Sequence, residues 1–151
     1  MAHELRAEIV IDAPPSLVWA ILTDLAAYPD WNPFITCSEG SIGVGERLTN
    51  RIEQVGGKAV TFQPTITQVD EQRVLEWLGR LVLPWLFDGR HRFELLPDGD
   101  GTRLVQMERF TGVLVPLLRK RLDTETRAGF EAMNTALKAR AESSPGQRHG
   151  H

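Results

Sequence analysis

Cysteine and histidine are scarce in this chain of 151 residues, and their scarcity excludes several kinds of site. Cys37 is the only cysteine, so the chain has no intramolecular disulfide and no cluster of thiolates that could hold a metal. His3, His149 and His151 lie near the chain ends, which leaves His91 as the single internal histidine. We therefore predict that the protein needs neither a metal nor another cofactor.

The sequence also lacks long apolar runs and an excess of positive charge. Its longest apolar stretches, 81–87 and 113–118, hold seven and six residues, far below the roughly 20 that a membrane-spanning helix needs. Glu4 and Glu8 occupy the start of the chain, where a secretory signal carries basic residues and then an apolar stretch. The net charge of −3 does not favour contact with the phosphates of nucleic acid. We expect a cytoplasmic protein that neither inserts stably into a membrane nor binds nucleic acid.

Length and composition favour one globular domain. Hydrophobic residues make up 42% of the chain and charged residues 25%, which is typical of globular proteins. A chain of this length fits a single domain. Serine, proline and glycine at 143–146 end the last periodic segment. We therefore predict one domain over residues 1–144 and a flexible tail over 145–151.

The first 28 residues predict a strand and two short helices. Polar and apolar residues alternate over 3–11, which is typical of a strand with one wet face. Asp12 precedes two prolines and predicts the capped start of a short helix. Asp24 predicts the start of a second short helix that ends near Tyr28.

The remainder predicts a curved sheet covered by one long helix. Six further strand-like runs, joined by short connections, span 35–39, 46–55, 58–70, 73–82, 89–96 and 102–111. Together with the first strand they predict a seven-stranded antiparallel sheet. After Gly112 the apolar period changes to 3.6 residues, which predicts a helix of about 28 residues across the concave face. One helix covers a wide sheet imperfectly, so we expect a cavity of a few hundred Å³ between them.

Polar side chains occupy inward positions on the last two strands. His91 alternates with charged residues that mark the outer face, and Arg103 and Arg109 mark the outer face of the last strand. Gln106 and Glu108 therefore point inward. A hairpin loop of four residues places His91 opposite Gln106, and a loop of six residues places it opposite Glu108.

The candidate ligand-binding residues combine inward strand positions with an aromatic turn and the last helix. They are Trp31, Phe34, Asn50, Phe62, Trp77, Phe87, His91, Phe93, Gln106, Glu108, Phe130 and Met133. The turn with Trp31 and Phe34 either forms the rim of a pocket or packs the corner between helix and sheet. Residues 81–88 either form a lid or pack against the long helix.

Several segments also resemble a known group of proteins. These segments are APPSLVWAILTDLAAYPDWNPF, the strand pair DGRHRFEL and GTRLVQMERFTG, and the helix with FEAMNTALKARAE. Together they resemble the SRPBCC group, the START-like proteins that include polyketide cyclases and dehydratases. The resemblance covers nearly the whole chain and implies an α+β helix-grip fold with a hydrophobic cavity. It carries over no catalytic residue.

The sequence leaves the function open between classes. A binder of a hydrophobic small molecule, such as a lipid, polyketide or isoprenoid, needs only the cavity. A cyclase or dehydratase would use His91 and Glu108 as an acid/base pair, whereas a structural hydrogen bond is the alternative role of that pair. A partner-binding module would need the apolar turns to form one exposed patch. Neither enzymatic activity nor the oligomeric state follows from the sequence.

Overall fold

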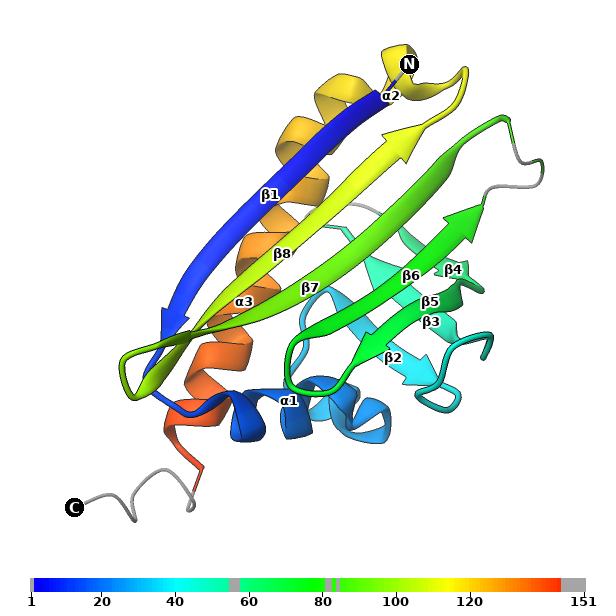
Figure 1. Ribbon diagram of the computed structural model, residues 1–151. Coiled ribbons are helices and arrows are strands. Elements are labelled where there is room, and N and C mark those ends of the chain that lie inside the picture. The colour runs from blue at the N-terminus through cyan, green and yellow to red at the C-terminus, as the bar shows by residue number, and fades with distance from the viewer. Residues whose placement is uncertain (1, 55–57, 81–82, 84, 145–151) are drawn as a thin grey trace.

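A five-stranded antiparallel sheet forms the main layer of the computed structural model, which describes residues 2–54, 58–80, 83 and 85–144. In spatial order the strands are β1 (Ala2–Ile11), β8 (Gly101–Thr111), β7 (Asp88–Asp98), β6 (Val74–Arg80) and β5 (Thr65–Asp70). The sheet curves strongly, with β1 and β5 at its two edges (Figure 1). The predicted tail over 145–151 lies outside the described residues.

The hairpin between β7 and β8 sets the register of the inward polar residues. Its turn is tight, with Asp98 paired to Gly101, and it places His91 opposite Glu108. This is the register predicted for the six-residue loop, because two further residue pairs extend the ladder toward the turn. β8 also pairs with β1 from Thr102 to Thr111, so β8 lies between two long neighbours.

A second, three-stranded sheet contains β2 (Ile35–Glu39), β3 (Thr49–Glu53) and β4 (Ala59–Phe62). The predicted single strand over 58–70 is wrong, because the chain leaves β4 at Gln63 and Pro64 and starts β5 in the other sheet. Pro64 has no N–H to give to a strand ladder, which favours a break at this point. The strand count is therefore eight rather than seven.

Two short helices connect the sheets, as predicted, but their ends differ from the prediction. They are α1 (Pro15–Thr23) and the 3₁₀ helix η1 (Leu25–Asp30). Neither Asp12 nor Asp24 caps a helix with its side chain: Pro14 is the N-cap of α1, and the side chain of Asp24 makes no capping bond. The backbone N–H of Asp12 instead donates to the Glu142 carboxylate at 2.8 Å.

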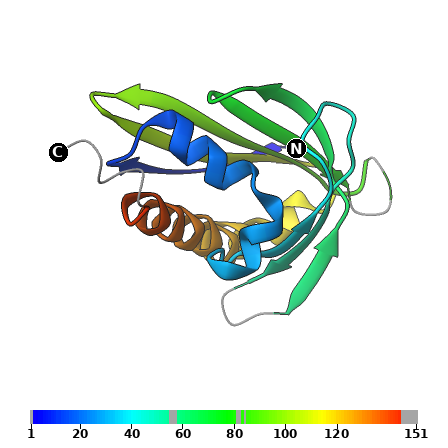
Figure 2. The ribbon, with the colours of Figure 1, turned by 90° about the horizontal axis from the view of Figure 1, so that it is seen from below.

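The C-terminal helical segment crosses the concave face of the main sheet. It consists of α2 (Val115–Arg121), a π-helical turn η2 (Leu122–Thr126) and α3 (Arg127–Glu142). The prediction of one uninterrupted helix missed this turn, which widens the backbone spiral while keeping Leu122 and Thr126 buried. Figure 2 shows α3 end-on, with the five-stranded sheet on one side and β2 to β4 curving round the other. The predicted α+β architecture, in which a curved sheet grips a long C-terminal helix, is confirmed.

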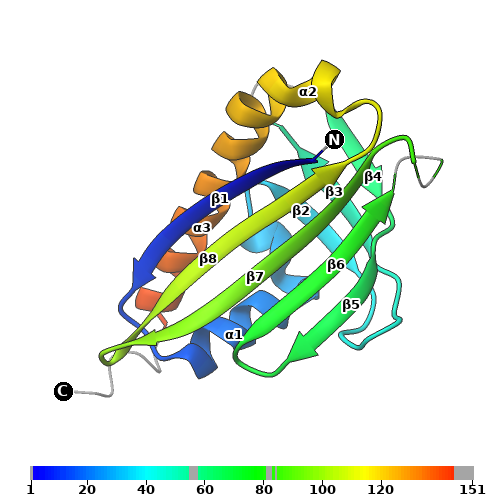
Figure 3. The same cartoon turned by 45° about the horizontal axis from the view of Figure 1, so that its top comes forward.

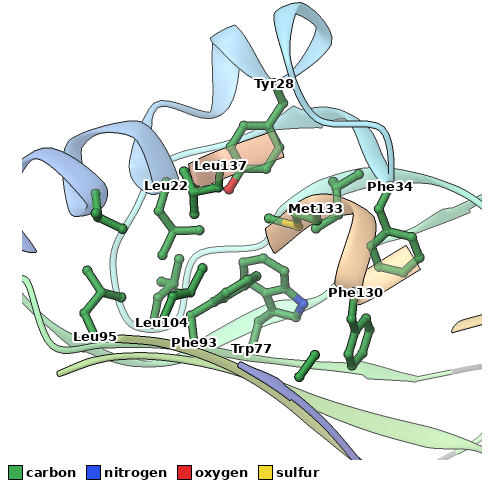
Figure 4. Packing of buried hydrophobic residues seen from close by; sticks show 14 of the residues in the cluster. Leu22, Tyr28, Phe34, Trp77, Phe93, Leu95, Leu104, Phe130, Met133 and Leu137 are labelled. Carbon is green, nitrogen blue, oxygen red and sulfur yellow. Dashed lines mark hydrogen bonds between the residues drawn. The ribbon is translucent and has the colours of Figure 1, made fainter. Parts of the chain in front are cut away.

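The apolar core lies between the main sheet, α1 and α3. Trp77 and Phe93 rise from the sheet toward Met133 on α3, and Phe34 packs against Phe130 (Figure 4). The centroids of these last two rings lie 5.6 Å apart in an edge-on arrangement. None of the described helices is both long and apolar enough to cross a membrane.

Candidate ligand-binding cavity

A partly enclosed cavity lies where the main sheet, the three-stranded sheet and η2 meet. Its volume is about 120 Å³. Its walls consist of Phe34, Ile35, Asn50, Ile52, Gln54, Phe62, Pro64, Trp77, Gly79, Arg80, Phe87, Gly89, His91, Glu108, Phe110, Leu122 and Thr126. The cavity is smaller than the few hundred Å³ that we predicted, because Phe130 and Met133 fill the middle of the concave face. A cavity near 150 Å³ accommodates one benzene-sized molecule.

Seven of the twelve predicted site residues line this cavity. They are Phe34, Asn50, Phe62, Trp77, Phe87, His91 and Glu108. The other five, Trp31, Phe93, Gln106, Phe130 and Met133, do not line it. Alternation along a strand shows which side chains point inward. It does not show whether an inward side chain lines the cavity or packs in the core, so it also selected core residues. Trp31 instead lines a separate depression with Ile21 and Arg140.

Some wall residues were absent from the predicted set. Arg80 is the last residue of β6 and Gln54 directly follows β3. At strand ends the alternation of side chains is a poor guide to the direction in which a side chain points. Leu122 and Thr126 lie on the predicted apolar stripe of the last helix. That stripe was the signal that could have found them, because Phe130 and Met133 were chosen from the same stripe.

Local structure in the aromatic turn directs Phe34 into the cavity. The side-chain oxygen of Asn32 accepts hydrogen bonds from the backbone N–H groups of Phe34 and Ile35, each at 2.9 Å. These two bonds fix the chain where it enters β2. On the other side, Gly129 of α3 leaves room for the Phe34 ring, since a side chain there would collide with it. Phe34 therefore lines the cavity, whereas Trp31 does not.

His91 is buried among aromatic rings on the sheet side of the cavity. Its ring stacks on Trp77, with centroids 5.3 Å apart and planes inclined by 26°. Its Nδ1 lies 3.0 Å from Oε1 of Glu108, and its Nε2 lies 2.9 Å from Oε1 of Gln106. The inward side chains of β7 and β8 thus bring His91 beside both Gln106 and Glu108.

A chain of hydrogen bonds behind His91 fixes which atoms donate. The Gln106 amide nitrogen donates to the backbone carbonyl of Phe130 at 3.3 Å and to the side-chain oxygen of Asn134 at 2.8 Å. Asn134 in turn donates to the backbone carbonyl of Ala7 at 3.3 Å. Backbone carbonyls only accept hydrogen bonds, so they orient both amides. The oxygen of Gln106 must then face His91, and Nε2 of His91 must carry a proton.

This assignment leaves one further proton for the contact between His91 and Glu108. With Nε2 protonated, the contact at Nδ1 is either an imidazolium donating to a carboxylate or a carboxylic acid donating to a neutral imidazole. Both arrangements contain one proton between the two groups. Glu108 lines the cavity, and its other oxygen occupies space that Gly89 leaves free, because a Cβ at that position would collide with it. The pair can therefore give or accept a proton at the cavity wall.

The other polar groups near the cavity are already engaged. Asn50 accepts a hydrogen bond from the Ser38 hydroxyl at 2.5 Å, and Arg80 lies 3.4 Å from Asp88. Tyr28 in η1 donates to the backbone carbonyl of Leu22 and does not line the cavity. Burial raises the pKa of the Tyr28 phenol well above its usual value, so it stays protonated. Within the described residues, no group of three or more side chains is arranged to hold a metal ion.

Comparison with known sequences identifies the family. The family described as "Polyketide cyclase / dehydrase and lipid transport" matches residues 2–142 of the chain. The chain belongs to this family. Because the match spans both sheets and α3, the family assignment covers the cavity as well as the fold. No curated protein sequence matches this member of the polyketide cyclase/dehydrase family.

Solved structures with the same fold include aromatase/cyclases. The Zhui aromatase/cyclase of a Streptomyces species is 20% identical, covers 94% of each chain and gives a TM-score of 0.77. TTHA0849 of Thermus thermophilus is 23% identical over 94% of this chain and 100% of its own, with a TM-score of 0.75. The di-domain aromatase/cyclase StfQ of the steffimycin pathway is 14% identical, with a TM-score of 0.78 over 100% of this chain and 53% of its own. At these identities the similarity establishes the shared fold only.

Proposed function

We propose that this polyketide cyclase/dehydrase family protein binds a small hydrophobic molecule in the cavity between its two sheets. The observation that carries the proposal is an apolar cavity with one hydrogen-bonded polar pair, His91 and Glu108, in its wall. Phe62, Phe87 and Phe110 contribute apolar surface, and Phe87 stacks on Phe110 with centroids 5.5 Å apart. A ligand with a ring body and one oxygen fits this arrangement, with the oxygen at Glu108.

Cavity size limits the ligand that enters without rearrangement. A volume of about 120 Å³ accepts a single ring but not a lipid or a fused polyketide. Phe34 and Phe87 form parts of the wall that are not continuous with the sheet, so a larger ligand would displace them first. We therefore propose that a lipid, isoprenoid or polyketide enters with one end only, or with displacement of these two rings.

Titration with p-cresol and toluene tests this proposal. Both are single-ring probes, and only p-cresol has a hydroxyl group for Glu108. We expect p-cresol to bind once per chain and more tightly than toluene, as measured by calorimetry and by NMR shifts of cavity residues. Ile52→Phe fills the cavity and should weaken p-cresol binding by roughly tenfold or more. Ile42→Phe adds the same volume outside the cavity and serves as the matched control.

Two results would contradict the proposal. One is the absence of p-cresol binding at millimolar concentration. The other is equal loss of binding in the Ile52 and Ile42 variants, because the binding would then not depend on the cavity.

A second candidate function is acid/base catalysis of a cyclisation or dehydration. It is favoured by the position of His91 and Glu108, which both line the cavity and lie 3.0 Å apart. Dehydration needs a base that removes a proton from carbon and an acid that protonates the departing hydroxyl, so that water leaves. If the pair is catalytic, Glu108→Gln should lower turnover of an aromatic polyketide analogue by about 10²- to 10⁴-fold while binding of toluene, which has no hydroxyl group for Glu108, persists. Turnover that stays unchanged in the variant would show that the pair is not catalytic.

A further inference from the structure

Two loops and α2 are held together at one end of the molecule. The backbone N–H of Val113 donates to the carbonyl of Trp85 at 3.2 Å, and that of Leu114 donates to the carbonyl of Leu86 at 3.1 Å. Gly112 makes this approach possible, because a side chain there would collide with the backbone of Leu86. Figure 3 shows α2 at the same end of the molecule as the end of β8 and the start of β7.

Exposed apolar side chains are concentrated at this end. Leu83, Trp85, Val113 and Leu117 are four of the eight large apolar residues that are exposed in the described part of the chain, and we call them the apolar rim. Trp85 is 60% exposed and Leu117 is 78% exposed. The other four lie apart from the rim, on β1, β4, β7 and the loop before β3. A contiguous exposed apolar surface usually marks a site of interaction.

Basic side chains lie next to the apolar rim. Arg119, Lys120 and Arg121 occupy the last turn of α2 and are exposed. Residues three and four positions apart share a helix face, so Lys120 and Arg121 lie on the side of Leu117. Arg121 pairs with Glu125 at 2.9 Å, whereas Arg119 and Lys120 form no ion pair within the described residues. Three consecutive basic residues thus lie here, and the nearest acidic residues along the chain, Asp123 and Glu125, contact His3 and Arg121.

We propose that the apolar rim and the basic turn of α2 dock this end of the protein on a membrane surface that contains anionic lipid. Tryptophan and aliphatic side chains at loop tips favour the boundary between headgroups and acyl chains. Basic side chains beside them are attracted to anionic headgroups. Docking of this kind uses side chains at the surface and needs no spanning helix.

A second copy of the chain fits this surface less well than a membrane does. A two-fold contact through the rim would bring the two basic turns face to face, since such a contact uses the same patch on both copies. Their like charges would oppose the contact, whereas an anionic bilayer neutralises them. The charge of the patch thus favours the lipid surface.

Docking would place the cavity beside the bilayer. Phe87, two residues after Trp85, lines the cavity, and so does Leu122, which directly follows the basic turn. A hydrophobic ligand could then pass between bilayer and cavity with little exposure to water. The docking surface does not itself depend on ligand binding, so the two proposals fail separately.

Flotation with lipid vesicles tests the docking surface. We expect the protein to float with vesicles of phosphatidylcholine and phosphatidylglycerol at low salt, and to remain unbound with pure phosphatidylcholine. Leu117→Glu and Lys120→Glu should each reduce binding, by about fivefold or more per changed charge. Raising the salt concentration to about 0.5 M should also reduce binding, because it screens the basic turn.

Matched variants at other sites serve as controls. Val44→Glu changes an exposed apolar residue in the loop before β3, and Arg140→Glu changes an exposed basic residue at the far end of α3. Both should bind vesicles as the unchanged protein does. The proposal is overturned if anionic vesicles do not bind the protein, or if the control and rim variants lose binding equally. It is also overturned if light scattering shows a dimer that Leu117→Glu dissociates, because the rim would then be covered by a second copy.

Discussion

The protonation of His91 is determined by groups that lie outside the cavity. The backbone carbonyls of Phe130 and Ala7 orient Gln106 and Asn134, and these amides leave only an acceptor facing Nε2 of His91. We predict that Nε2 carries a proton at pH 7, as measured by long-range ¹H–¹⁵N NMR. Gln106→Met removes the acceptor that faces Nε2, so the proton should no longer favour Nε2 over Nδ1. An unprotonated Nε2 in the unchanged protein would contradict the assignment of Nε2 as the donor to Gln106.

Replacement of His91 measures how much this arrangement stabilises the fold. His91→Gln retains one donor and one acceptor, so we expect a loss of about 1–2 kcal/mol. For a domain of this size that loss lowers the melting temperature by roughly 2–8 °C. His3→Gln is the control, since His3 meets Asp123 at the surface and its replacement should change the melting temperature much less. Equal effects of the two replacements would contradict a structural role for the buried chain.

At the scale of elements, the sequence predicted the strands and their inward faces better than it predicted where a strand or helix is interrupted. The order of strands and helices, and the inward faces of β6, β7 and β8, follow from alternation because each strand has one wet face. The division of 58–70 between two sheets depends on where Pro64 stops the ladder, and the alternation of Phe62, Pro64 and Ile66 continues across that break. Likewise, the π-helical turn η2 keeps the apolar stripe intact, so the stripe could not reveal it.

The outer face of the main sheet contains an ionic network that makes stability depend on pH. The carboxylate of Glu76 on β6 accepts hydrogen bonds from Thr67, Arg90 and Arg92, at 2.9–3.0 Å. Burial raises the pKa of this carboxyl group, but the hydrogen bonds from Arg92, Thr67 and Arg90 lower it by more, so the pKa lies below its usual value. The carboxylate therefore stabilises the folded state at neutral pH, and this contribution is lost as the pH falls below about 4.5.

Glu76→Gln tests this contribution of the network. We expect the free energy of unfolding of the variant at pH 7 to be about 1–3 kcal/mol lower than that of the unchanged protein. The reason is that Arg90 and Arg92 would then donate to an uncharged group. The difference from the unchanged protein should shrink in urea titrations performed at progressively lower pH below 4.5. Glu53→Gln, in an exposed pair with Arg51, is the control and should have little effect. A difference that stays constant with pH would show that charge is not its source.

At the scale of the whole molecule, the cavity depends on how closely the two sheets and α3 approach one another. Alternation supplied five of the predicted residues that line it, namely Asn50, Phe62, Trp77, His91 and Glu108. It did not predict the volume, because volume depends on which core side chains fill the concave face. Phe93, Phe130 and Met133 point inward as predicted and occupy space that was expected to be empty. Arg80 and Gln54 complete the wall from strand ends, whose directions are set by the packing of both sheets together.

Gly129 on α3 allows one of these close approaches. The Phe34 ring lies against its backbone, lines the cavity and packs on Phe130, so it joins α3 to the three-stranded sheet.

Gly129→Ala adds a methyl group where Phe34 now lies, and the ring must move toward the cavity. Although alanine favours the helix, we expect a net loss of about 1–3 kcal/mol from overpacking and weaker p-cresol binding. Gly43→Ala, whose added Cβ would come no closer than 3.4 Å to its nearest neighbour, is the control for the substitution itself. Thermal melting and calorimetry of both variants check the expectation. If Gly129→Ala were as stable as the unchanged protein and bound p-cresol equally well, the contact between α3 and Phe34 would not determine the cavity.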